Sequence, residues 1–425
     1  MNIKDLHSIF LEFPSVSTDT RKIKKNDIFF ALKGDNFNGN TYAQQAINNG
    51  ASYVIIDQKE YYINDKTILV DDTLIMLQKL ANFHRNYCDA KVISLTGSNG
   101  KTTTKELIHA VLAEKYKTIA TVGNLNNHIG VPLTLLSILP DTEIAIIEMG
   151  ANHLKEIEFL CKIAEPDFGY ITNFGKAHLE GFGGIEGVIK GKSELYEYLI
   201  NNKKAIFLNA DDSIQLEKLK KYTKKYGFSS VNPKYYRIEL EEAQPFVIIK
   251  VENTNIKSNL IGAYNFHNCC AAIIIGKFFN VELTDIKIAL EKYTPENNRS
   301  QIIKTNGHYI ILDAYNANPS SMKAAIENFN SLAKTVKVLI LGDMFELGES
   351  AMEEHQEVVK LTKKMNFDKV IFVGENFYKT KSDFIKLRSF NDLKSFLKEN
   401  KLPSNSSILI KGSRGMALER VLDCL

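Results

Sequence analysis

The sequence predicts an α/β fold of three domains: a small N-terminal α/β domain, a central P-loop domain on a parallel sheet, and a C-terminal Rossmann-like domain. Three observations support this prediction. The chain has 425 residues, more than one hydrophobic core usually organises. Short, unbroken apolar runs recur through its central and C-terminal parts, as is typical of parallel strands buried on both faces. A glycine-rich turn also joins one of these runs to an amphipathic helix.

The first domain is predicted to span residues 1–85. Strand-like runs at 27–32 and 52–56 flank a turn-rich stretch at 33–40, which a helical pattern at 43–47 follows. The turn-rich stretch contains Gly, Asn, Lys and an exposed Phe. It is either a plain surface loop or a site for a polar, planar ligand, and the residues alone do not decide between the two.

The central domain is predicted to span residues 86–295. Its strands are the apolar runs at 92–95, 144–147, 168–171 and 205–208. Because ligands of parallel sheets gather at the carboxyl ends of the strands, the residues just after each run matter most. A β-rich segment of shorter strands at 229–262 and a helix through 271–278 complete the domain.

The run at 92–95 leads into the turn around which the chain is organised. The residues of this turn are Gly97, Ser98, Asn99, Gly100, Lys101, Thr102 and Thr103. A strand, a tight turn and a helix start aim backbone N–H groups and the positive end of a helix dipole at one point, where a triphosphate fits. Lys101 is expected to reach the outer phosphates of ATP, and the Thr102 hydroxyl to bind the Mg²⁺ that bridges them. Leu95 occupies the first glycine position of the full P-loop pattern, so the alternative is an ordinary strand-to-helix turn.

Further candidates follow the neighbouring runs. Glu148 ends the run at 144–147, and an acid in that position beside a phosphate loop is a natural magnesium ligand. His178 lies in the loop after the run at 168–171. The alternative for Glu148 is a helix-capping or solvated acid, and the alternative for His178 is a structural histidine. The polar loop at 121–132 suits a polar substrate, although a capped loop would have the same composition.

The third domain is predicted to span residues 296–425, after a linker at 293–298. Its apolar runs, at 310–312, 338–341, 370–373 and 408–410, alternate with helical patterns and end in polar or glycine-rich tips. This pattern predicts a second open parallel sheet, and without a GxGxxG fingerprint nothing indicates a dinucleotide. Arg299 and Lys101 are the available cations for a γ-phosphate, and Arg299 would reach it when the third domain swings onto the central one.

Composition narrows the class of protein. Hydrophobic residues make up 44% and charged residues 24%, which is ordinary for a globular protein. The net charge is +3 without a dense basic run, so we expect no nucleic-acid partner. The five cysteines show no CxxC spacing and are expected to be reduced thiols. No secretory leader or apolar stretch of about 18 residues occurs, so we expect neither export nor a membrane span. We expect a cytoplasmic protein that is a monomer.

Several motifs together resemble the Mur ligase family. They are the stretches at 96–103, 148–151 and 313–319, the His178 loop and Asn268. Within the family, the stretches at 17–21, 30–34, 341–348 and 411–414 look like the type that joins D-alanyl-D-alanine to UDP-N-acetylmuramoyl-tripeptide. The resemblance covers all three domains in order.

This resemblance implies an ATP-dependent peptide ligase of cytoplasmic peptidoglycan precursor synthesis. ATP would phosphorylate the terminal carboxylate of the tripeptide, and the amine of the dipeptide would attack the resulting acyl phosphate. A carboxylate is a poor electrophile until one of its oxygens belongs to a phosphate leaving group. The amine must also lose a proton, and the sequence does not identify the base that accepts it.

The resemblance also implies roles for individual residues. Those expected to serve the reaction are Lys101, Lys192, His178 and Arg299, and those expected to hold Mg²⁺ are Thr102, Glu148, His178 and a carbamylated Lys192. Beyond the phosphate loop, the nucleotide would contact Asn268, Arg299, Asp313 and Asn316. The UDP group would lie near Thr20, Arg21, Lys33, Gly34, Phe37 and Asn38, the muramoyl tripeptide near Asn126, Asn127 and His128, and the dipeptide near Lys411, Ser413 and Arg414. Asn298 and Gly191 stand where many relatives have Gly and Ala.

Other functions remain open at this point. A sister Mur ligase that adds an earlier amino acid, or an enzyme like folylpolyglutamate synthetase, would share the ATP chemistry. The stretch at 341–348, together with 19–21 and 32–34 in the first domain, argues against both. A nucleotide-dependent regulatory ATPase would hydrolyse ATP without forming an amide. The sequence does not specify whether the third residue of the tripeptide is lysine or diaminopimelate.

Overall fold

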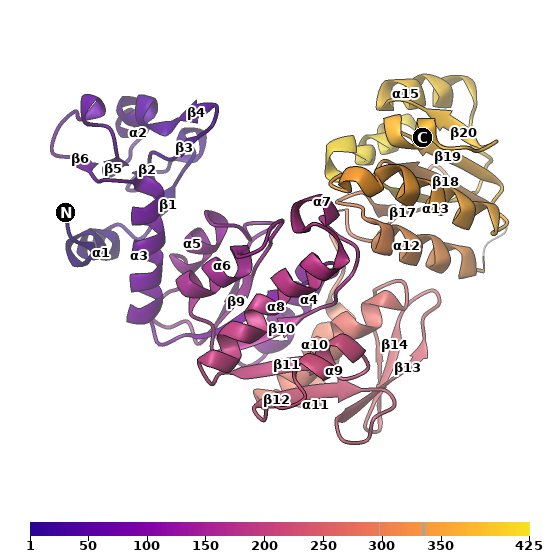
Figure 1. Ribbon diagram of the computed structural model, residues 1–425, viewed down its shortest axis with the longest axis horizontal. Helices are drawn as coiled ribbons and strands as arrows, with labels where there is room; N and C mark the ends of the chain where they lie inside the picture. The colour runs from indigo at the N-terminus through magenta and orange to yellow at the C-terminus, as the bar shows by residue number, and fades with distance from the viewer. Residues whose placement is uncertain (297, 334–335) are drawn as a thin grey trace.

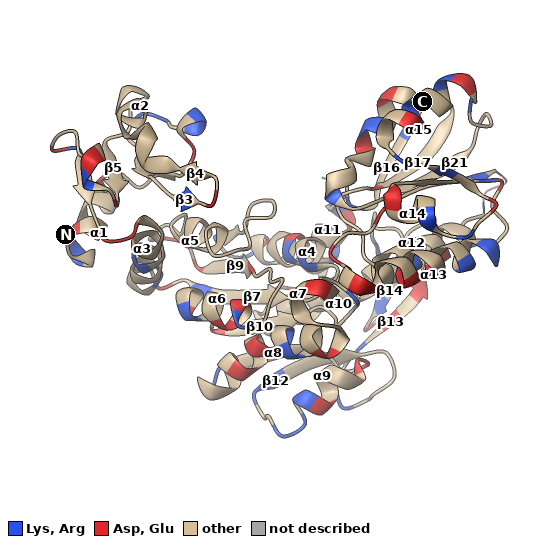
Figure 2. Cartoon of the chain, turned by 45° about the horizontal axis from the view of Figure 1, so that its top comes forward, with Lys and Arg blue, Asp and Glu red and all other residues tan. Residues whose placement is uncertain are grey.

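A computed structural model describes residues 1–296, 298–333 and 336–425. The chain forms three bodies in chain order, each built on a sheet of its own (Figure 1). The first and third bodies lie on opposite sides of the central one. Acidic and basic residues are spread over all three bodies (Figure 2). None of the described helices is long and apolar enough to cross a membrane.

The first body contains a parallel sheet in the order β1-β2-β5-β6. Its strands are β1 (Val16–Ser17), β2 (Ile28–Phe30), β5 (Tyr53–Ile56) and β6 (Thr67–Leu69), and its helices are α1 (Ile3–Glu12), α2 (Ala43–Asn48) and α3 (Thr73–Tyr87). The turn-rich stretch forms an antiparallel hairpin of β3 (Lys33–Gly34) and β4 (Phe37–Asn38). Asp72 caps α3 by accepting a hydrogen bond from the Ile75 N–H at 2.8 Å. Because α3 packs on α1 and on helices of the central body, it joins the two.

The central body contains a nine-stranded sheet in the order β15-β14-β13-β12-β11-β10-β7-β9-β8. The strands are β7 (Lys91–Thr96), β8 (Thr118–Ala120), β9 (Ile144–Glu148), β10 (Phe168–Ile171), β11 (Ala205–Asn209), β12 (Lys225–Ser229), β13 (Tyr236–Glu242), β14 (Ile248–Val251) and β15 (Thr254–Lys257). Pairing is parallel from β8 to β13, and β14 and β15 extend the sheet in antiparallel fashion.

Helices cover both faces of this sheet, which explains its unbroken apolar strands. On one face lie α4 (Lys101–Ala113), α10 (Tyr264–Phe278) and α11 (Leu283–Lys292), and on the other α5 (Gly130–Leu135), α6 (Glu156–Ala164) and α8 (Ile185–Asn201). The short helices α7 (Leu179–Phe182) and α9 (Ser213–Lys218) follow β10 and β11. Ile93 and Leu95 of β7 belong to the core on the side of α4 and α10, whereas Val92 belongs to the core on the side of α5 and α6. Both sides of the strand must therefore be apolar.

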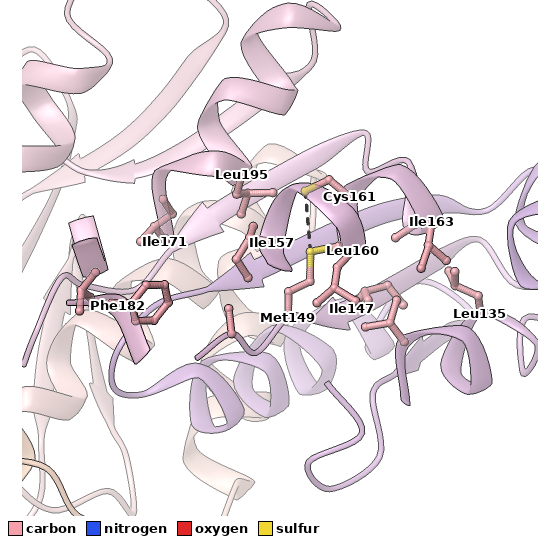
Figure 3. Close-up of a cluster of buried hydrophobic side chains, with 14 of the residues drawn as sticks. Leu135, Ile147, Met149, Ile157, Leu160, Cys161, Ile163, Ile171, Phe182 and Leu195 are labelled. Atoms are coloured by element: carbon pink, nitrogen blue, oxygen red, sulfur yellow. Dashed lines mark hydrogen bonds between the residues drawn. The ribbon is translucent and has the colours of Figure 1, made fainter. Parts of the chain in front are cut away.

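A hydrophobic cluster supports the end of β9 (Figure 3). Met149 packs there against α6, with its Sδ 3.9 Å from the Sγ of Cys161, and Leu195 of α8 and Phe182 of α7 belong to the same buried core. The residues that follow β9 therefore rest on a packed floor of side chains. These packed side chains hold Met149 in place and so support Glu148, the last residue of β9.

The third body contains a six-stranded sheet in the order β16-β17-β21-β18-β19-β20. The strands are β16 (Gln301–Thr305), β17 (His308–Asp313), β18 (Lys337–Gly342), β19 (Lys369–Val373), β20 (Ile385–Leu387) and β21 (Ser407–Lys411). The helices α12 (Pro319–Ser331), α13 (Ala351–Lys363) and α14 (Glu375–Lys379) contribute side chains to one core, and α15 (Phe390–Glu399) contributes to another.

The four predicted strands of the third sheet, β17, β21, β18 and β19, pair in parallel as expected, and β16 adds an antiparallel edge that was not predicted. Strand β16 pairs antiparallel with β17 through Asn306 and Gly307, both of which have positive φ angles. An Asn-Gly pair is the common sequence of a two-residue hairpin turn, so a local signal for this strand was present. Of the predicted linker, residues 293–296 follow α11, and residue 297 lies outside the described part of the chain.

Candidate active site

A cavity of about 1110 Å³ lies between the central and third bodies. The central body lines it with the phosphate loop, the polar loop before α5, the end of β9 and the His178 loop, and the third body with the ends of β17 and β21 and the start of α12. The predicted site residues in its wall are Ser98, Asn99, Gly100, Lys101, Thr102, Thr103, Asn126, Asn127, His128, Glu148, His178, Asn268, Arg299, Asp313, Asn316 and Lys411. The fold thus brings together residues that lie more than 300 positions apart in the chain.

The phosphate loop needs its two glycines. Gly97 has a φ of +140° and Gly100 a φ of +77°, which side chains rarely tolerate. A Cβ on Gly97 would lie 2.0 Å from the Thr172 Oγ1, and one on Gly100 would lie 2.6 Å from the Asn268 Oδ1. Helix α4 begins directly after this turn, and no side chain caps it. Its first N–H groups are therefore available to an anion in the cavity.

Two cations stand beside this helix start. Nζ of Lys101 donates a hydrogen bond of 2.8 Å to the carbonyl of Gly97. Burial lowers the pKa of Lys101; the carboxylate of Glu148 opposes this effect, and the charge of Arg299 adds to it. The guanidinium of Arg299 lies 3.6 Å from the centre of the Tyr315 ring, and its buried Nε has no hydrogen-bond partner. Two neighbouring cations favour a polyanionic ligand. Tyr315, which lies in the motif at 313–319, supports Arg299, although no role was predicted for it.

Glu148 has the features of a metal ligand. The side chain ends β9 and is 1% exposed. One carboxylate oxygen accepts a hydrogen bond of 2.8 Å from Nδ2 of Asn126, while Oε2 is buried without a partner. Thr102, also buried, lines the same cavity. The described residues contain no cluster of three or more His, Cys, Asp or Glu side chains that would enclose a metal by itself, so the donors fit a magnesium ion that shares its ligands with phosphates and water.

His178 faces the third body. The residue precedes α7 with a φ of +53°, and its Nδ1 lies against the Oε2 of Glu346. The contact with His178 lowers the pKa of Glu346, and burial opposes this shift. Glu346 also lines the cavity. Glu346 lies in the stretch at 341–348 that resembles the family, but no role was predicted for this residue.

Lys192 lies beneath the cavity wall and does not line it. The side chain is fully buried in α8, where Nζ donates to the carbonyl of Ala151 at 2.9 Å and lies 5.0 Å from the centre of the Phe182 ring. Burial lowers the pKa of Lys192 well below its ordinary value. A neutral amine is the form that reacts with CO₂, so the environment fits a carbamate. A Cβ on Gly191 would lie 2.4 Å from the Cε1 of Phe182, which accounts for glycine at that position.

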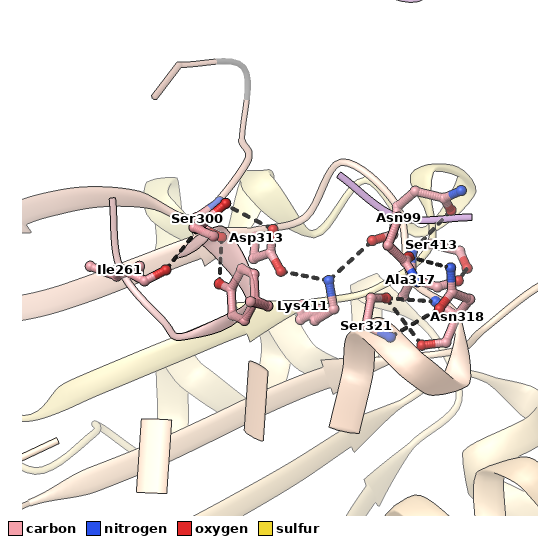
Figure 4. A network of polar contacts seen from close by, with 12 residues as sticks. Asn99, Ile261, Ser300, Asp313, Ala317, Asn318, Ser321, Lys411 and Ser413 are labelled. Atoms are coloured by element: carbon pink, nitrogen blue, oxygen red, sulfur yellow. Dashed lines mark hydrogen bonds and ion pairs between the residues drawn. The ribbon is translucent and has the colours of Figure 1, made fainter. Parts of the chain in front are cut away.

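A polar network connects the strands of the third body to the cavity (Figure 4). Lys411 of β21 lies opposite Asp313 of β17, and its Nζ donates to Oδ2 of Asp313 at 2.5 Å and to the carbonyl of Asn316 at 3.2 Å. The other oxygen of Asp313 accepts the N–H of Ser300 at 3.1 Å. The Lys411–Asp313 pair therefore holds Ser300, the residue next to Arg299. This leaves the Lys411 ammonium engaged with protein groups.

Asn268 and Ser413 also have protein partners. Oδ1 of Asn268 accepts from the Thr104 hydroxyl at 3.0 Å, and Nδ2 donates to Asn265 at 2.8 Å, which ties α10 to the phosphate-loop helix. The Ser413 hydroxyl accepts the N–H of Phe345 at 2.9 Å. Arg414 is exposed and pairs with Glu419 at 2.9 Å. Of the three residues predicted near the dipeptide, only Lys411 is in the cavity wall.

The residues predicted near UDP form a separate group in the first body. Lys33, Gly34, Phe37 and Asn38 make up the β3–β4 hairpin, while Thr20 and Arg21 lie in a short 3₁₀ helix, η1 (Thr20–Lys22). The ring of Phe37 stacks on that of Tyr42 at 5.5 Å, and both side chains are exposed. Nζ of Lys33 lies 3.1 Å from the buried carboxylate of Asp57. Tyr42 and Asp57 are supporting residues that the sequence analysis did not name.

Comparison with known proteins gives matches along the whole chain. Residues 12–85 match the model described as "Mur ligase family, catalytic domain", residues 95–276 the "Mur ligase middle domain", and residues 298–414 the "Mur ligase, glutamate ligase domain". UDP-N-acetylmuramoyl-tripeptide--D-alanyl-D-alanine ligase of Bacillus subtilis (strain 168) is 38% identical, over 96% of this chain and 92% of the relative. The ligase of the same name from Escherichia coli (strain K12) is 32% identical, over 99% and 95%.

Solved structures agree with these matches. A crystal structure of MurF from Acinetobacter baumannii has a TM-score of 0.85 and 30% identity, covering 96% of this chain and 92% of that one. The MurF ligase of Thermotoga maritima in complex with ADP has a TM-score of 0.84 and 27% identity, covering 97% of both chains. The folylpolyglutamate synthase of Thermotoga maritima, at 13% identity and a TM-score of 0.58, shares the fold alone. This chain belongs to the Mur ligase family.

Proposed function

We propose that this protein is an ATP-dependent ligase that joins D-alanyl-D-alanine to UDP-N-acetylmuramoyl-tripeptide in cytoplasmic peptidoglycan precursor synthesis. One observation carries the proposal. A phosphate loop with Lys101 faces Arg299 of the third body across a single cavity, and the polar loop of Asn126 and His128 lines the same cavity. Relatives that share 32–38% of this sequence over nearly its full length carry the name of this activity.

The chemistry proceeds in two steps. A carboxylate oxygen of the tripeptide attacks the γ-phosphorus of ATP, the bond to the leaving ADP oxygen breaks, and an acyl phosphate forms. The free amine of the dipeptide then attacks the acyl carbon, a proton leaves the nitrogen, and the tetrahedral intermediate collapses to amide and phosphate. Lys101 and Arg299 stabilise the negative charge that spreads over the transferred phosphoryl group.

A magnesium site fits the donors in the cavity wall. Thr102, Glu148 and His178, with a carbamylated Lys192 behind them, are the residues that would hold the ion, and the unpartnered Oε2 of Glu148 supports this assignment. Mg²⁺ held by these residues would supply positive charge that neutralises the phosphates. The role of the protein side chains is to fix the carboxylate acceptor in line with that group while the closed third body keeps water away.

The remaining assignments follow the fold. The exposed Phe37–Tyr42 stack beside Lys33 supports a uridine diphosphate site on the first body. Asn268, Asp313 and Asn316 are proposed to contact the nucleotide, and the tip at 411–414 is proposed to flank the dipeptide. We propose domain limits of 1–85, 86–295 and 296–425, which place each of the three larger sheets in a domain of its own. We also propose a monomeric enzyme.

Phosphate release with each substrate omitted in turn tests the proposal. The ligase requires ATP, the UDP-tripeptide and D-alanyl-D-alanine together. Release that is indifferent to the dipeptide would identify a regulatory ATPase, and release supported by a single amino acid on a shorter UDP-peptide would identify a sister ligase. Running the assay with lysine-containing and diaminopimelate-containing tripeptides, beside a UDP-free control, identifies the acceptor.

A further inference from the structure

A contact between the central and third bodies joins two residues of unusual backbone conformation. His178 has a φ of +53° and Glu346 a φ of +60°. Residues other than glycine adopt positive φ angles where the surrounding structure holds the backbone in that conformation. Nδ1 of His178 lies against Oε2 of Glu346, and the two side chains are 19% and 52% exposed. Both residues line the cavity.

The contact belongs to a broader interface between the loop before α7 and the third body. The N–H of Glu180 donates to the carbonyl of Glu346 at 3.2 Å, and that of Lys176 donates to the hydroxyl of Ser320 at 2.9 Å. Nζ of Lys176 pairs with Glu354 at 2.6 Å. Figures 1 and 2 both draw α7 beside the third body. The Glu346 carboxylate therefore reaches the histidine while the third body rests on the central one.

The chemistry of histidine gives this contact a specific consequence. A metal-binding histidine commonly donates its second ring N–H to a carboxylate, which fixes the tautomer and orientation of the ring. Nδ1 is the ring nitrogen that meets Glu346, so Nε2 is the nitrogen left for another partner. Nε2 is then the nitrogen able to bind a cation. The Glu346 carboxylate comes from the third body, whereas the proposed metal ligands all lie in the central body.

We infer that Glu346 is a positioning residue for His178, and that docking of the third body thereby completes the magnesium site. The inference rests on the proposed function, because it takes His178 to be a ligand of the ion that accompanies ATP. It adds a consequence for the reaction sequence. Metal affinity rises when the third body closes, so tight metal binding is coupled to the arrangement that excludes water from the acyl phosphate.

Mn²⁺ binding to the full-length enzyme, with the non-hydrolysable analogue adenylyl imidodiphosphate, tests this inference. The electron paramagnetic resonance signal of free Mn²⁺ gives the affinity, and the pulsed spectrum reports nitrogen ligands. Glu346→Ala is expected to weaken Mn²⁺ affinity about tenfold. Glu346→Gln is expected to lose less, because its amide keeps an oxygen of similar position beside Nδ1. The matched control is Glu354→Gln, which removes another carboxylate from the same interface and is expected to keep wild-type affinity.

The outcomes separate this inference from the proposed function. Nitrogen modulation that His178→Ala abolishes, with no further affinity loss when Glu346→Ala is added, supports the inference. Unchanged affinity in Glu346→Ala, or equal losses in Glu346→Ala and Glu354→Gln, overturns it. Absence of nitrogen modulation in the wild type overturns it together with the assignment of His178 as a ligand. Amide formation, assayed in parallel with all three substrates, decides whether the proposed ligase reaction stands in each case.

Discussion

Nδ2 of Asn318 donates a hydrogen bond of 2.7 Å to Oδ1 of Asn99, so the start of α12 rests directly on the phosphate loop. Asn318 is also the N-cap of α12, where its Oδ1 accepts the N–H of Ser321 at 2.9 Å. The oxygen of one amide thus begins a helix of the third body, while its nitrogen holds the loop that is proposed to bind ATP. This contact couples domain docking to the nucleotide site.

Asn99→Ala tests that coupling. The substitution removes the acceptor and leaves the cap of α12 intact, and the lost hydrogen bond is worth about 0.5–1.5 kcal/mol. We expect kcat for amide formation to fall by up to about tenfold at saturating ATP, since each 1.4 kcal/mol corresponds to a factor of about ten. The control is Asn328→Ala, which breaks the hydrogen bond of 2.8 Å from Gln244 between the same two bodies at another place. An equal loss in the control would show that docking in general, and not the contact at Asn99, is responsible.

Lys101→Met is expected to abolish turnover. The substitution keeps most of the side-chain volume and removes a cation from the transferred phosphoryl group, and loss of one such group typically costs about 10²–10³ in rate. Lys117→Met provides the control, because this exposed lysine pairs with Asp141 on the surface, at 2.8 Å. Thermal unfolding of both variants checks the fold, and multiple-turnover phosphate release gives the rate. A wild-type rate in Lys101→Met would refute the site.

The sequence predicted the inner strands and the phosphate loop because their signals are local. Both faces of β7 and β9 are buried, so their residues form unbroken apolar runs. The edge strands β8 and β20 gave no such signal, since each has three residues that are all partly exposed. Strand β16 lies at the other edge of its sheet with a similar pattern of partial exposure, and only its Asn-Gly turn marked it.

The parts of the site that the sequence did not predict depend on tertiary contacts. Nothing in the local pattern around Glu346 indicates that its carboxylate meets His178, because the contact requires two bodies to dock. Lys411 was expected near the dipeptide, and its alignment with Asp313 became visible only once β21 was paired with β17. Motif resemblance identified the residues; the partners of their side chains follow from the packing of the three bodies.

Two buried histidines predict how stability depends on pH. Nε2 of His7 lies 3.0 Å from Nδ1 of His84, and Nε2 of His84 lies 2.8 Å from the carbonyl oxygen of Ile138. Burial lowers the pKa of both below the ordinary value of 6.5, and the charge of His84 lowers that of His7 further. Both are therefore neutral in the folded state, and their contribution to stability is present above pH 6.5 and is lost as the pH falls through the folded-state pKa values.

We therefore expect the Tm to fall as the pH is lowered from about 7 to about 5, where histidine takes up a proton in the unfolded chain. His7→Gln is expected to show a smaller acid-induced fall, because one of the two protonation sites is gone. His153→Gln serves as the control, since this side chain is 65% exposed and should leave the pH profile unchanged. Circular dichroism melts measure the effect. Identical pH profiles in His7→Gln and the wild type would contradict the assignment.

Lys192→Ala is expected to inactivate the enzyme and to regain part of its activity with added formate or acetate. The substitution leaves a space where the buried Nζ met the carbonyl of Ala151, and a short carboxylate can enter it and supply the oxygen that a carbamate would supply. The wild type should also show a carbamate carbon by NMR after incubation with ¹³C-bicarbonate. Lys190→Ala, on the same helix, is the control and should retain activity without carboxylates. Full activity of Lys192→Ala without any additive would mean that no carbamate takes part, whereas inactivity that neither carboxylate relieves, with no carbamate signal in the wild type, would leave the buried amine a purely structural role.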